Sequence, residues 1–310
     1  MRHAMTNHWF EEPEPGRVTH SAMSRLIVTD EAVDGQVGYQ TEVVFPSAAK
    51  TVEATESFGL REKKNNAAFN VAWQTDLQSM VWAAQDPVKV GWFSGLMKGY
   101  QRSSEMFNLK YIVEGYDWAG LEEGLVVDVG GNTGTVSQAI AKAAPKLKFI
   151  VQDQPAAVAR GRDELPHEMT DRITFQEHDF FTPNPVQSPD IFLLRFILHD
   201  WPDEDAKAIL KNLIPSMTAK TKLIIADAIV PSPKTLPYTQ EKHIRNMDIT
   251  IMTMMNAMER TRKDWQTLIE SVDPPLKILD MNVPKTNAIS IVEVMRACPG
   301  PSEEAQVLAS

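Results

Sequence analysis

The sequence has a single cysteine, Cys298, in 310 residues, so it holds no disulfide framework. No apolar run approaches the roughly 18 to 20 residues that a membrane-spanning helix needs, and the opening segment MRHAMTNHWF lacks the apolar stretch of a signal peptide. The chain has no cluster of lysine and arginine, and its net charge of −10 argues against nucleic acid as a main partner. These absences predict a cytoplasmic protein without a membrane or nucleic-acid partner.

The hydrophobic content of 43% is sufficient for a large buried core, and the central region alternates strand-like with helix-like patterns. The expected strands span residues 125–129, 148–153, 173–179, 191–197 and 222–230. Alternation of this kind predicts an α/β protein with a doubly wound parallel sheet. Long helical patterns follow at about 237–258 and 261–272. Two last strand-like runs, LKILDMNVP and AISIVEVMR, are separated by KTN and predict an antiparallel hairpin added to the sheet.

The region before this sheet has a different character. Residues 1–60 contain the acidic, proline-bearing turn EEPEPG, which predicts a hairpin between two helices. From Ala48 to Met106 the pattern is helical and rich in tryptophan, phenylalanine and methionine. Such side chains usually form a core, and the alternative is that some of them line an apolar pocket for a flat substrate. The histidines near the start form no i,i+4 ligand pair, so we expect no metal site.

The segment LVVDVGGNTG, residues 125–134, has the pattern of a buried strand, a tight glycine turn and the start of a helix. A dinucleotide site would need the spacing G-x-G-x-x-G, but the required positions after Gly130 hold Asn132 and Thr135. The chain also lacks the lysine and hydroxyl residues of a triphosphate-binding loop. The turn therefore suits a nucleoside ligand that is not recognised through its phosphates.

Acidic residues end the neighbouring strands. Asp128 precedes the glycines, Asp153 ends the second strand, and Asp179 ends the third. A carboxylate at such a strand end accepts hydrogen bonds from ribose hydroxyls. Acids around an adenosine-sized site suit a ligand that carries ribose and positive charge, so the sequence predicts S-adenosylmethionine as cofactor.

Six motifs then occur in order: DVGGNTG, VQDQP, HDFF, RFILHDWPDEDAKAIL, ADAIVP and NAMERT. Together they resemble the S-adenosylmethionine-dependent O-methyltransferases of plant and fungal secondary metabolism, of the caffeate/flavonoid type. The resemblance covers nearly the whole chain, and HDWPDE and MERT are more diagnostic than the glycines. It implies a Rossmann-like doubly wound sheet with a C-terminal antiparallel strand, preceded by a partial winged-helix and helical N-terminal region.

The resemblance also implies a domain organisation. Members of this family carry further dimerisation helices before the wing, so we expect the chain to be N-terminally short and its full-length form to be a homodimer. The expected division is a partial winged-helix and dimerisation region over 1–60, a helical connector that lines the substrate pocket over 61–115, an S-adenosylmethionine-binding methyltransferase domain over 116–298 and a flexible tail over 299–310.

The cofactor residues carry over motif by motif. The resemblance implies that Phe180 covers the adenine and that Arg195, where plant members have lysine, pairs with the methionine carboxylate. The full set of implied cofactor-binding residues is Gly130, Asp153, Asp179, Phe180 and Arg195.

Methyl transfer to a phenol requires loss of a proton whose pKa is about 10, so a positioned base assists. His199 follows an apolar strand, at the edge where open α/β sheets bind ligands, and histidine titrates near neutral pH. By resemblance His199 is the general base, and Asp227 and Glu259 are the acids that orient its imidazole. Plant members usually have glutamate in place of Asp227, and the aspartate side chain is one methylene shorter. Each residue taken alone also fits a structural role.

The expected substrate is a small molecule with a phenolic or polyketide-like hydroxyl. The residues expected to contact it are Trp73, Met106, Met255 and Asn256. For the methionines of the helix over 237–258, packing in the core is the alternative.

Two other functions remain as alternatives. Some fungal relatives bind S-adenosylmethionine yet catalyse a pericyclic or dehydration step, and they tend to lose the histidine-centred base. The presence of His199, Asp227 and Glu259 favours methyl transfer over that alternative. A DNA-binding regulator built on the winged-helix remnant is disfavoured by the negative charge.

Overall fold

The computed structural model describes residues 1–60, 63–103, 108–284 and 289–297. The chain divides into two compact units, one of Met1–Glu105 with Met252–Asn256 and one of Met106–Ile251 with Ala257–Ser310. The predicted substrate residue Met106, the KTN turn and the predicted tail over 299–310 lie outside the described residues. The predicted four-part division of the chain stays a prediction.

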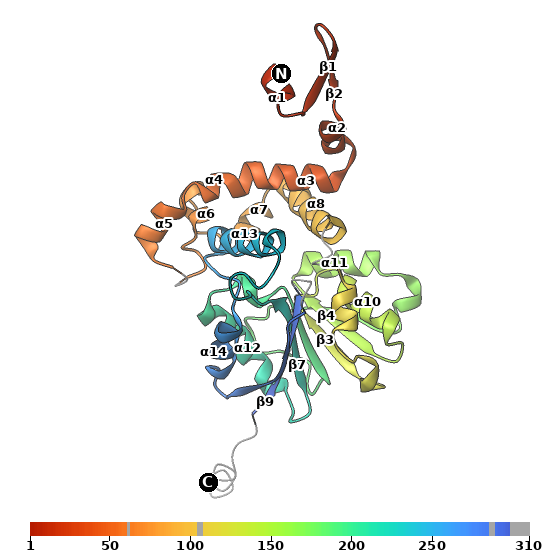
Figure 1. Cartoon of the computed structure of the whole chain (residues 1–310). Coiled ribbons are helices and arrows are strands. Elements are labelled where there is room, and N and C mark those ends of the chain that lie inside the picture. The colour runs from red at the N-terminus through yellow and green to blue at the C-terminus, as the bar shows by residue number, and fades with distance from the viewer. Residues whose placement is uncertain (61–62, 104–107, 285–288, 298–310) are drawn as a thin grey trace, which may run out of the picture. The chain divides into compact units, whose positions relative to one another are not determined.

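The first unit is helical apart from one small antiparallel sheet (Figure 1). Its hairpin pairs Phe10 with His20 and lies where the EEPEPG turn predicts it. Ser21 and Asp30 accept backbone N–H bonds and so start the two helices that follow. In chain order the elements are α1 (Arg2–Met5), β1 (Phe10–Glu14), β2 (Arg17–His20), α2 (Ala22–Thr29), α3 (Glu31–Tyr39), a π-helical turn (Gln40–Val44), α4 (Phe45–Ala48), α5 (Thr51–Phe58), α6 (Ala68–Trp73), α7 (Ser79–Ala83) and α8 (Pro87–Ser103).

Aromatic side chains form much of the core of this first unit. Phe69 is fully buried, and its ring lies 5.3 Å from that of Trp82 in an edge-to-face contact. Trp73 packs on the same ring at 4.7 Å. Helices α3 and α8 can approach closely because Gly35 has no Cβ. A Cβ there would lie only 2.6 Å from the Cα of Gly95. Most of the aromatic residues between 48 and 106 therefore pack in a core, as the first of the two interpretations held.

The second unit contains a seven-stranded sheet in the order β5-β4-β3-β6-β7-β9-β8. The first five strands along the chain are parallel, and β9 pairs antiparallel with both β7 and β8. This confirms the predicted doubly wound sheet with its C-terminal hairpin. The strands are β3 (Leu125–Val129), β4 (Lys148–Asp153), β5 (Ile173–Glu177), β6 (Ile191–Arg195), β7 (Lys222–Ala228), β8 (Leu276–Asn282) and β9 (Ile289–Arg296).

Helices cover both faces of this sheet (Figure 1). One face packs against Ile209 of α12 and Trp265 of α14, and the other against Ile140 of α10 and Val158 of α11. Burial on both faces explains why the central parallel strands β3, β6 and β7 are almost continuously buried, whereas the edge strand β5 alternates. The helices are α9 (Lys110–Glu114), α10 (Thr135–Ala143), α11 (Pro155–Glu164), α12 (Asp203–Leu213), α13 (Tyr238–Met255) and α14 (Arg262–Glu270). No helix of the described residues is long and apolar enough to cross a membrane.

Three predicted strands are two residues too long at their carboxyl ends. They were expected to end at 179, 197 and 230, but the structure ends them at Glu177, Arg195 and Ala228. After Arg195 the backbone turns sharply, and Phe196 takes a left-handed conformation with φ of 50°. After β6 and β7 the apolar pattern continues because residues that leave the sheet, such as Ile197 and Ile229, still pack against the core, whereas His178 and Asp179 follow β5.

Candidate active site

The carboxyl edge of the sheet gathers most of the predicted site residues of the second unit. The chain runs from β3 outward to β4 and β5 and then crosses back, so that β6 pairs with the other side of β3. Ligands of open α/β sheets bind outside the carboxyl ends of the strands at such a switch point. Gly130 follows β3, Asp153 ends β4 and Arg195 ends β6, so the fold places three predicted cofactor residues at this edge.

The glycine turn after β3 is tightly held. Gly130 has a φ of 72°, and a Cβ added there would lie 2.5 Å from Cδ1 of Ile197. The N–H groups of Gly130 and Gly131 both donate to the carbonyl of Gln152, at 2.8 and 3.1 Å. Asn132 adopts a left-handed conformation with φ of 52°, which asparagine tolerates better than most residues. Asn132 therefore fits the turn although many plant relatives have glycine there.

Asp128, near the end of β3, stabilises this turn through a buried hydrogen bond. Its carboxylate is 1% exposed and accepts a 2.6 Å hydrogen bond from the hydroxyl of Ser137 in α10. Burial raises the pKa of Asp128 to about 6, against the opposing influence of Ser137 and Arg195. A buried carboxyl that bonds to the following helix orders the turn.

Asp153 is fixed at the edge of the turn by two backbone groups. Its carboxylate accepts the N–H of Asn132 at 2.8 Å and that of Gln154 at 2.7 Å. Burial raises the pKa of Asp153, while these two N–H groups and the charge of Arg160 oppose the rise. Arg160 in turn donates to the side chain of Asn132 at 3.0 Å. The carboxylate oxygens retain lone pairs in fixed directions, as the recognition of ribose hydroxyls requires.

We expect Asp153→Ala to weaken S-adenosylmethionine binding by about 10- to 100-fold, the scale of lost hydrogen bonds to a charged group. Asp153→Asn, which keeps an acceptor for the N–H of Asn132, should lose less affinity. Isothermal titration calorimetry with S-adenosylmethionine and S-adenosylhomocysteine measures both effects. An unchanged cofactor affinity with a raised KM for the acceptor alone would mean that the ribose lies elsewhere.

The two remaining predicted cofactor residues, Asp179 and Phe180, follow β5, and Arg195 ends β6. Asp179 is exposed and accepts the N–H of Phe181 at 3.0 Å. The ring of Phe180 packs against the rings of Phe181 and Trp201, at 5.1 and 5.7 Å. Burial lowers the pKa of the Arg195 guanidinium to about 10, although nearby carboxylates oppose it. Their roles toward the adenine and the methionine carboxylate stay predictions.

His199 lies in a short 3₁₀ turn, Leu198–Asp200, directly after β6. Its Nδ1 lies 2.7 Å from Oε1 of Glu259, a residue 60 positions later in the chain. Its Nε2 lies 3.4 Å from Oδ1 of Asp200. The ring of Phe196 packs at 5.2 Å from the imidazole. The structure therefore brings together His199 and one of its two predicted acids in a buried hydrogen bond.

Asp227, the second predicted acid, makes no hydrogen bond to His199 and acts on it through its charge. It lies near the end of β7, is 1% exposed, and neither of its carboxylate oxygens has a hydrogen-bond partner among the described residues. Burial raises the pKa of Asp227 to about 7, with the charges of Glu259 and Asp200 adding to the rise and those of His199 and Arg260 opposing it. The aspartate is one methylene shorter than the glutamate of plant members.

The charge state of His199 follows from these neighbours. Burial by itself lowers the pKa of His199, but the carboxylates of Asp200, Glu259 and Asp227 outweigh burial and raise that pKa to about 10. Burial also raises the pKa of Asp200 to about 6. These carboxylates therefore favour the protonated imidazole in the free protein, and the hydrogen bond to Glu259 stabilises it.

The buried carboxyl of Asp227 makes folding stability depend on pH. A carboxyl whose pKa is raised by folding stabilises the folded state below its unfolded pKa of about 4, and this contribution is lost as the pH rises through 7. Between pH 5 and 8 we expect the wild type to lose about 2 kcal/mol more unfolding free energy than Asp227→Asn. Urea unfolding at both pH values measures the difference, with the exposed acid variant Asp163→Asn as control. Equal losses in wild type and Asp227→Asn would show that Asp227 is ionised throughout.

Three predicted substrate residues lie in the first unit. Asn256 follows α13 with φ of 51°, and its side-chain amide donates to the carbonyl of Lys63 at 3.0 Å. Met255 is partly buried against the core of that unit. Trp73 packs on Trp82. Packing thus accounts for Met255 and Trp73 and a backbone contact for Asn256, while their contact with substrate stays a prediction.

Sequence reasoning missed two residues of this site. Asp200 directly follows the predicted base, and its place in the HDW motif was a signal that could have identified it. Arg260 follows Glu259 in MERT and is fully buried. In the described part of the chain, no group of three histidine, cysteine or acidic side chains is placed to hold a metal ion.

Comparisons with known proteins identify the family. A family model described as an O-methyltransferase domain matches residues 59–272. The O-methyltransferase VdtC of Byssochlamys spectabilis is 40% identical over 300 residues, which cover 95% of this chain and 69% of that protein. The O-methyltransferase pgmB of Aspergillus terreus is 38% identical, with 95% of this chain and 84% of that protein covered.

Solved structures show the same fold. The mitomycin 7-O-methyltransferase MmcR superposes with a TM-score of 0.78 at 20% identity, over 96% of this chain and 82% of that one. LepI, solved in complex with SAM, superposes with a TM-score of 0.72 at 24% identity, over 94% of this chain and 74% of that one. Its family-model match and its fungal relatives place the chain in the S-adenosylmethionine-dependent O-methyltransferase family.

Proposed function

We propose that the chain transfers a methyl group from S-adenosylmethionine to a phenolic hydroxyl of a small secondary metabolite, with His199 as general base. The observation that carries the proposal is the 2.7 Å hydrogen bond between Nδ1 of buried His199 and Oε1 of Glu259. A carboxylate at Nδ1 fixes one tautomer of the imidazole and stabilises its protonated form. The proton of the hydroxyl is then accepted at Nε2.

The residues at the sheet edge fit the cofactor. When bound, S-adenosylmethionine supplies an electrophilic methyl group on a positively charged sulfur. The close turn at Gly130 allows a ligand to approach the backbone, and Asp153 offers fixed acceptors for hydroxyl groups. Arg195 offers a guanidinium for a carboxylate. This donor set suits a nucleoside with an amino-acid side group.

The imidazole of His199 must be neutral before it can accept a proton. Because the surrounding carboxylates raise the pKa of His199 to about 10, the neutral fraction in the free protein grows as the pH rises above 7. Positive charge bound at the same sheet edge would lower this pKa, since like charges disfavour an imidazolium. In either case the hydrogen bond to Glu259 keeps a proton on Nδ1, so that Nε2 is the nitrogen that exchanges its proton.

The relatives support a proposal for the class of acceptor. One curated relative, 38% identical, is the O-methyltransferase of a grayanic acid biosynthesis cluster in Cladonia grayi. The structural neighbour NcsB1 was solved with 1,4-dihydroxy-2-naphthoic acid, which carries phenolic hydroxyls. We infer that this chain also takes a hydroxylated aromatic acceptor.

An assay with methyl-labelled S-adenosylmethionine tests the proposal, with 1,4-dihydroxy-2-naphthoic acid and other hydroxylated naphthoic acids as acceptors. We expect labelled product and S-adenosylhomocysteine to form in equal amounts. Conversion of an acceptor without S-adenosylhomocysteine would instead support a pericyclic or dehydration step.

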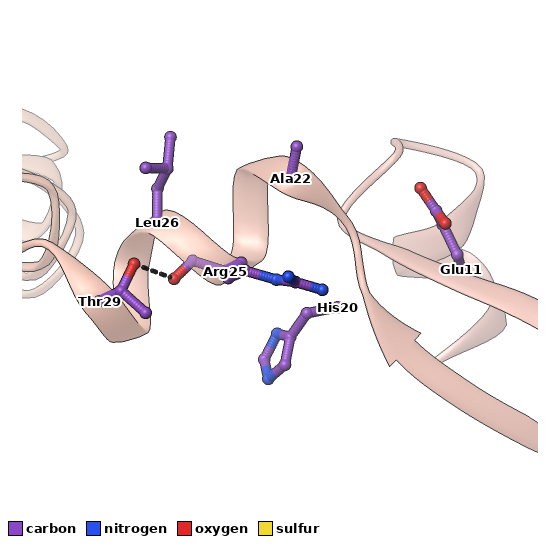
Figure 2. Close-up of a pocket in the computed structure, with 6 residues that line it drawn as sticks. All are labelled: Glu11, His20, Ala22, Arg25, Leu26 and Thr29. Carbon is purple, nitrogen blue, oxygen red and sulfur yellow. Dashed lines mark hydrogen bonds between the residues drawn. The ribbon is translucent and has the colours of Figure 1, made fainter.

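The homodimer expected of the full-length form stays a proposal, and features of the first unit support self-association of this chain as well. Helix α2 exposes Met23, Leu26 and Val28 to between 49 and 71%. Figure 2 shows the open hollow beside this helix, which has a volume of about 480 Å³ and is lined by Glu11, His20, Ala22, Arg25, Leu26 and Thr29. The hollow is lined by one acid, Glu11, and by the basic side chains of His20 and Arg25, so a two-fold copy of this surface could pair opposite charges across an interface.

Light scattering after size exclusion tests the dimer. We expect the wild type to have the mass of two chains and Leu26→Glu with Val28→Lys to have the mass of one. The exposed variant Val88→Lys, on α8, serves as control. A wild type that stays monomeric at a protein concentration of about 100 µM, at which a dimer with a micromolar Kd would form, would overturn this proposal.

A further inference from the structure

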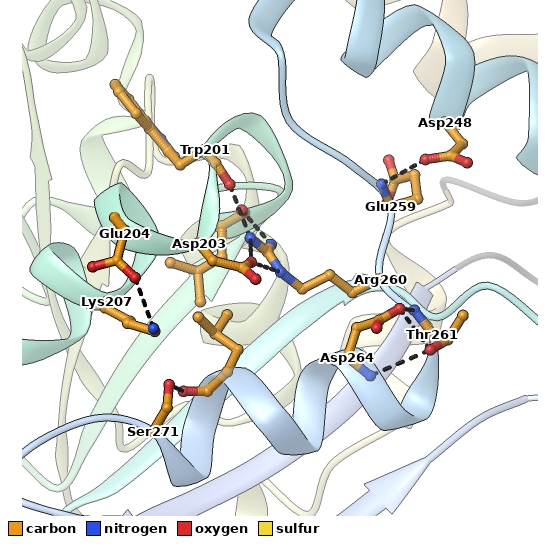
Figure 3. Close-up of polar contacts among 12 residues, drawn as sticks. Trp201, Asp203, Glu204, Lys207, Asp248, Glu259, Arg260, Thr261, Asp264 and Ser271 are labelled. Atoms are coloured by element: carbon orange, nitrogen blue, oxygen red, sulfur yellow. Dashed lines mark hydrogen bonds and ion pairs between the residues drawn. The ribbon is translucent and has the colours of Figure 1, made fainter. Parts of the chain in front are cut away.

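The two most diagnostic motifs of the sequence, HDWPDE and MERT, are joined by one side chain. Arg260 is fully buried, and its guanidinium donates to the carbonyl of Leu198 at 2.6 Å and to that of Trp201 at 2.9 Å. It also donates from two nitrogens to Oδ1 of Asp203, at 3.0 and 2.7 Å (Figure 3). The two carbonyls lie on either side of His199 and Asp200 in the chain.

We infer that Arg260 is a positioning residue for the base, which holds the His199 turn and the Glu259 segment together so that imidazole and carboxylate stay in hydrogen-bond contact. Because Arg260 directly follows Glu259, its contacts with the turn also fix where the glutamate side chain begins. The inference rests on the proposed role of His199 in methyl transfer.

The backbone around Arg260 is itself anchored on three sides. The N–H of Glu259 donates to Oδ1 of Asp248 in α13 at 3.0 Å. The carbonyl of Arg260 accepts the N–H of Val230, two residues after β7, at 2.9 Å. Thr261 caps α14 and exchanges hydrogen bonds with Asp264. Both ends of the Arg260 side chain are therefore attached to fixed structure, as a device that sets a distance requires.

Only arginine fits this arrangement. A guanidinium presents five N–H donors in a rigid plane, whereas a lysine ammonium is a single point charge on a flexible stem. Here the donors reach two carbonyls and a carboxylate that lie in different directions. The ring of Trp265, 5.3 Å from the guanidinium, covers it as well. Lysine would retain the charge and lose most of the contacts.

We call the contacts of Arg260 with Leu198, Trp201 and Asp203 the clamp. The carboxylates that face His199 make the pKa of His199 a direct readout of this clamp. These carboxylates are Asp200 on the same turn, Glu259 after α13 and Asp227 on β7. The charge of Arg260 acts to lower the pKa of Asp227. If the contacts of Arg260 loosen, the hydrogen bond that Nδ1 of His199 donates to Glu259 weakens, and the pKa of His199 falls. A purely structural role for Arg260 would reduce stability and leave this pKa unchanged.

The test compares Arg260→Lys with Arg172→Lys, whose guanidinium also donates to backbone carbonyls, those of Ala141 and Ala144, and serves as the matched control. Nitrogen chemical shifts of labelled histidine, assigned with His199→Ala, report the titration of His199 in the full chain without any methyl transfer. For Arg260→Lys we expect the pKa of His199 to fall by about one unit or more. We also expect kcat to fall by about 10- to 100-fold, with cofactor affinity within about twofold of wild type. Arg172→Lys should change none of these.

Asp203→Asn keeps the test decisive if Arg260→Lys fails to fold. Its side chain is half exposed, and the amide retains one acceptor for the guanidinium. We expect the same changes at smaller size. Folded variants with wild-type titration of His199 and wild-type kcat would overturn the inference. An active His199→Ala together with a shifted titration in Arg260→Lys would instead overturn the proposed function and leave the positioning role intact.

Discussion

Replacing His199 by alanine is expected to lower kcat by at least about 100-fold, the usual scale of a general base. Cofactor affinity should stay within about twofold of wild type, because the residues expected to bind the cofactor are in the glycine turn, at the end of β4, after β5 and at the end of β6. Steady-state kinetics with calorimetric titration of S-adenosylmethionine separates the two effects. The loss reflects chemistry, since the hydroxyl no longer has a partner that accepts its proton.

The exposed residue His167, in the 3₁₀ turn before β5, supplies the matched control. His167→Ala removes the same side chain at a position outside the six motifs and should keep wild-type kcat. A His199→Ala variant with unchanged kcat would show that another group accepts the proton. A variant that mainly lost cofactor affinity would show that His199 contributes to binding.

Replacing Glu259 by glutamine is expected to lower kcat by about 10- to 100-fold. The amide oxygen still accepts a hydrogen bond from the N–H at Nδ1, but it carries no charge that stabilises the imidazolium. Loss of that charge also lowers the pKa of His199, since Glu259 is among the carboxylates that raise it. The rise of activity with pH should therefore begin at lower pH in Glu259→Gln than in wild type.

A pH profile of kcat measures both parts of this expectation, with the exposed variant Glu270→Gln on α14 as control. A profile that loses height without moving along the pH axis would mean that the charge of Glu259 does not reach His199. The 2.7 Å separation of the two side chains makes that outcome incompatible with the structure.

The fold could be predicted largely from local patterns. The continuously apolar run LVVDV and its glycine turn identify β3, and alternation with helical patterns identifies the parallel sheet. The hairpin of β8 and β9 followed from two strand-like runs close together in the sequence. What the patterns missed were strand ends, because residues such as Phe196 and Ile197 are apolar for packing and not for pairing in the sheet.

The site could be predicted only in part, because its contacts join distant segments. The pair of His199 and Glu259 came from a family resemblance, since no local rule links residues 60 positions apart. The clamp of Arg260 depends on how the segment after α13 approaches the turn after β6. Asp227 shows what the resemblance could not predict. Its position matches the family, but in the described residues its carboxylate has no hydrogen-bond partner.

The central claim is that His199, held by Glu259, accepts the proton of the methyl acceptor. Single-turnover methyl transfer, followed from pH 6 to 10 with cofactor and acceptor saturating, tests it most directly in wild type and His199→Ala. The account predicts that the wild-type rate rises with pH through one ionisation and levels off, while His199→Ala is slower by at least about 100-fold at the plateau and lacks that ionisation. The same ionisation at the same pH in both proteins would contradict it.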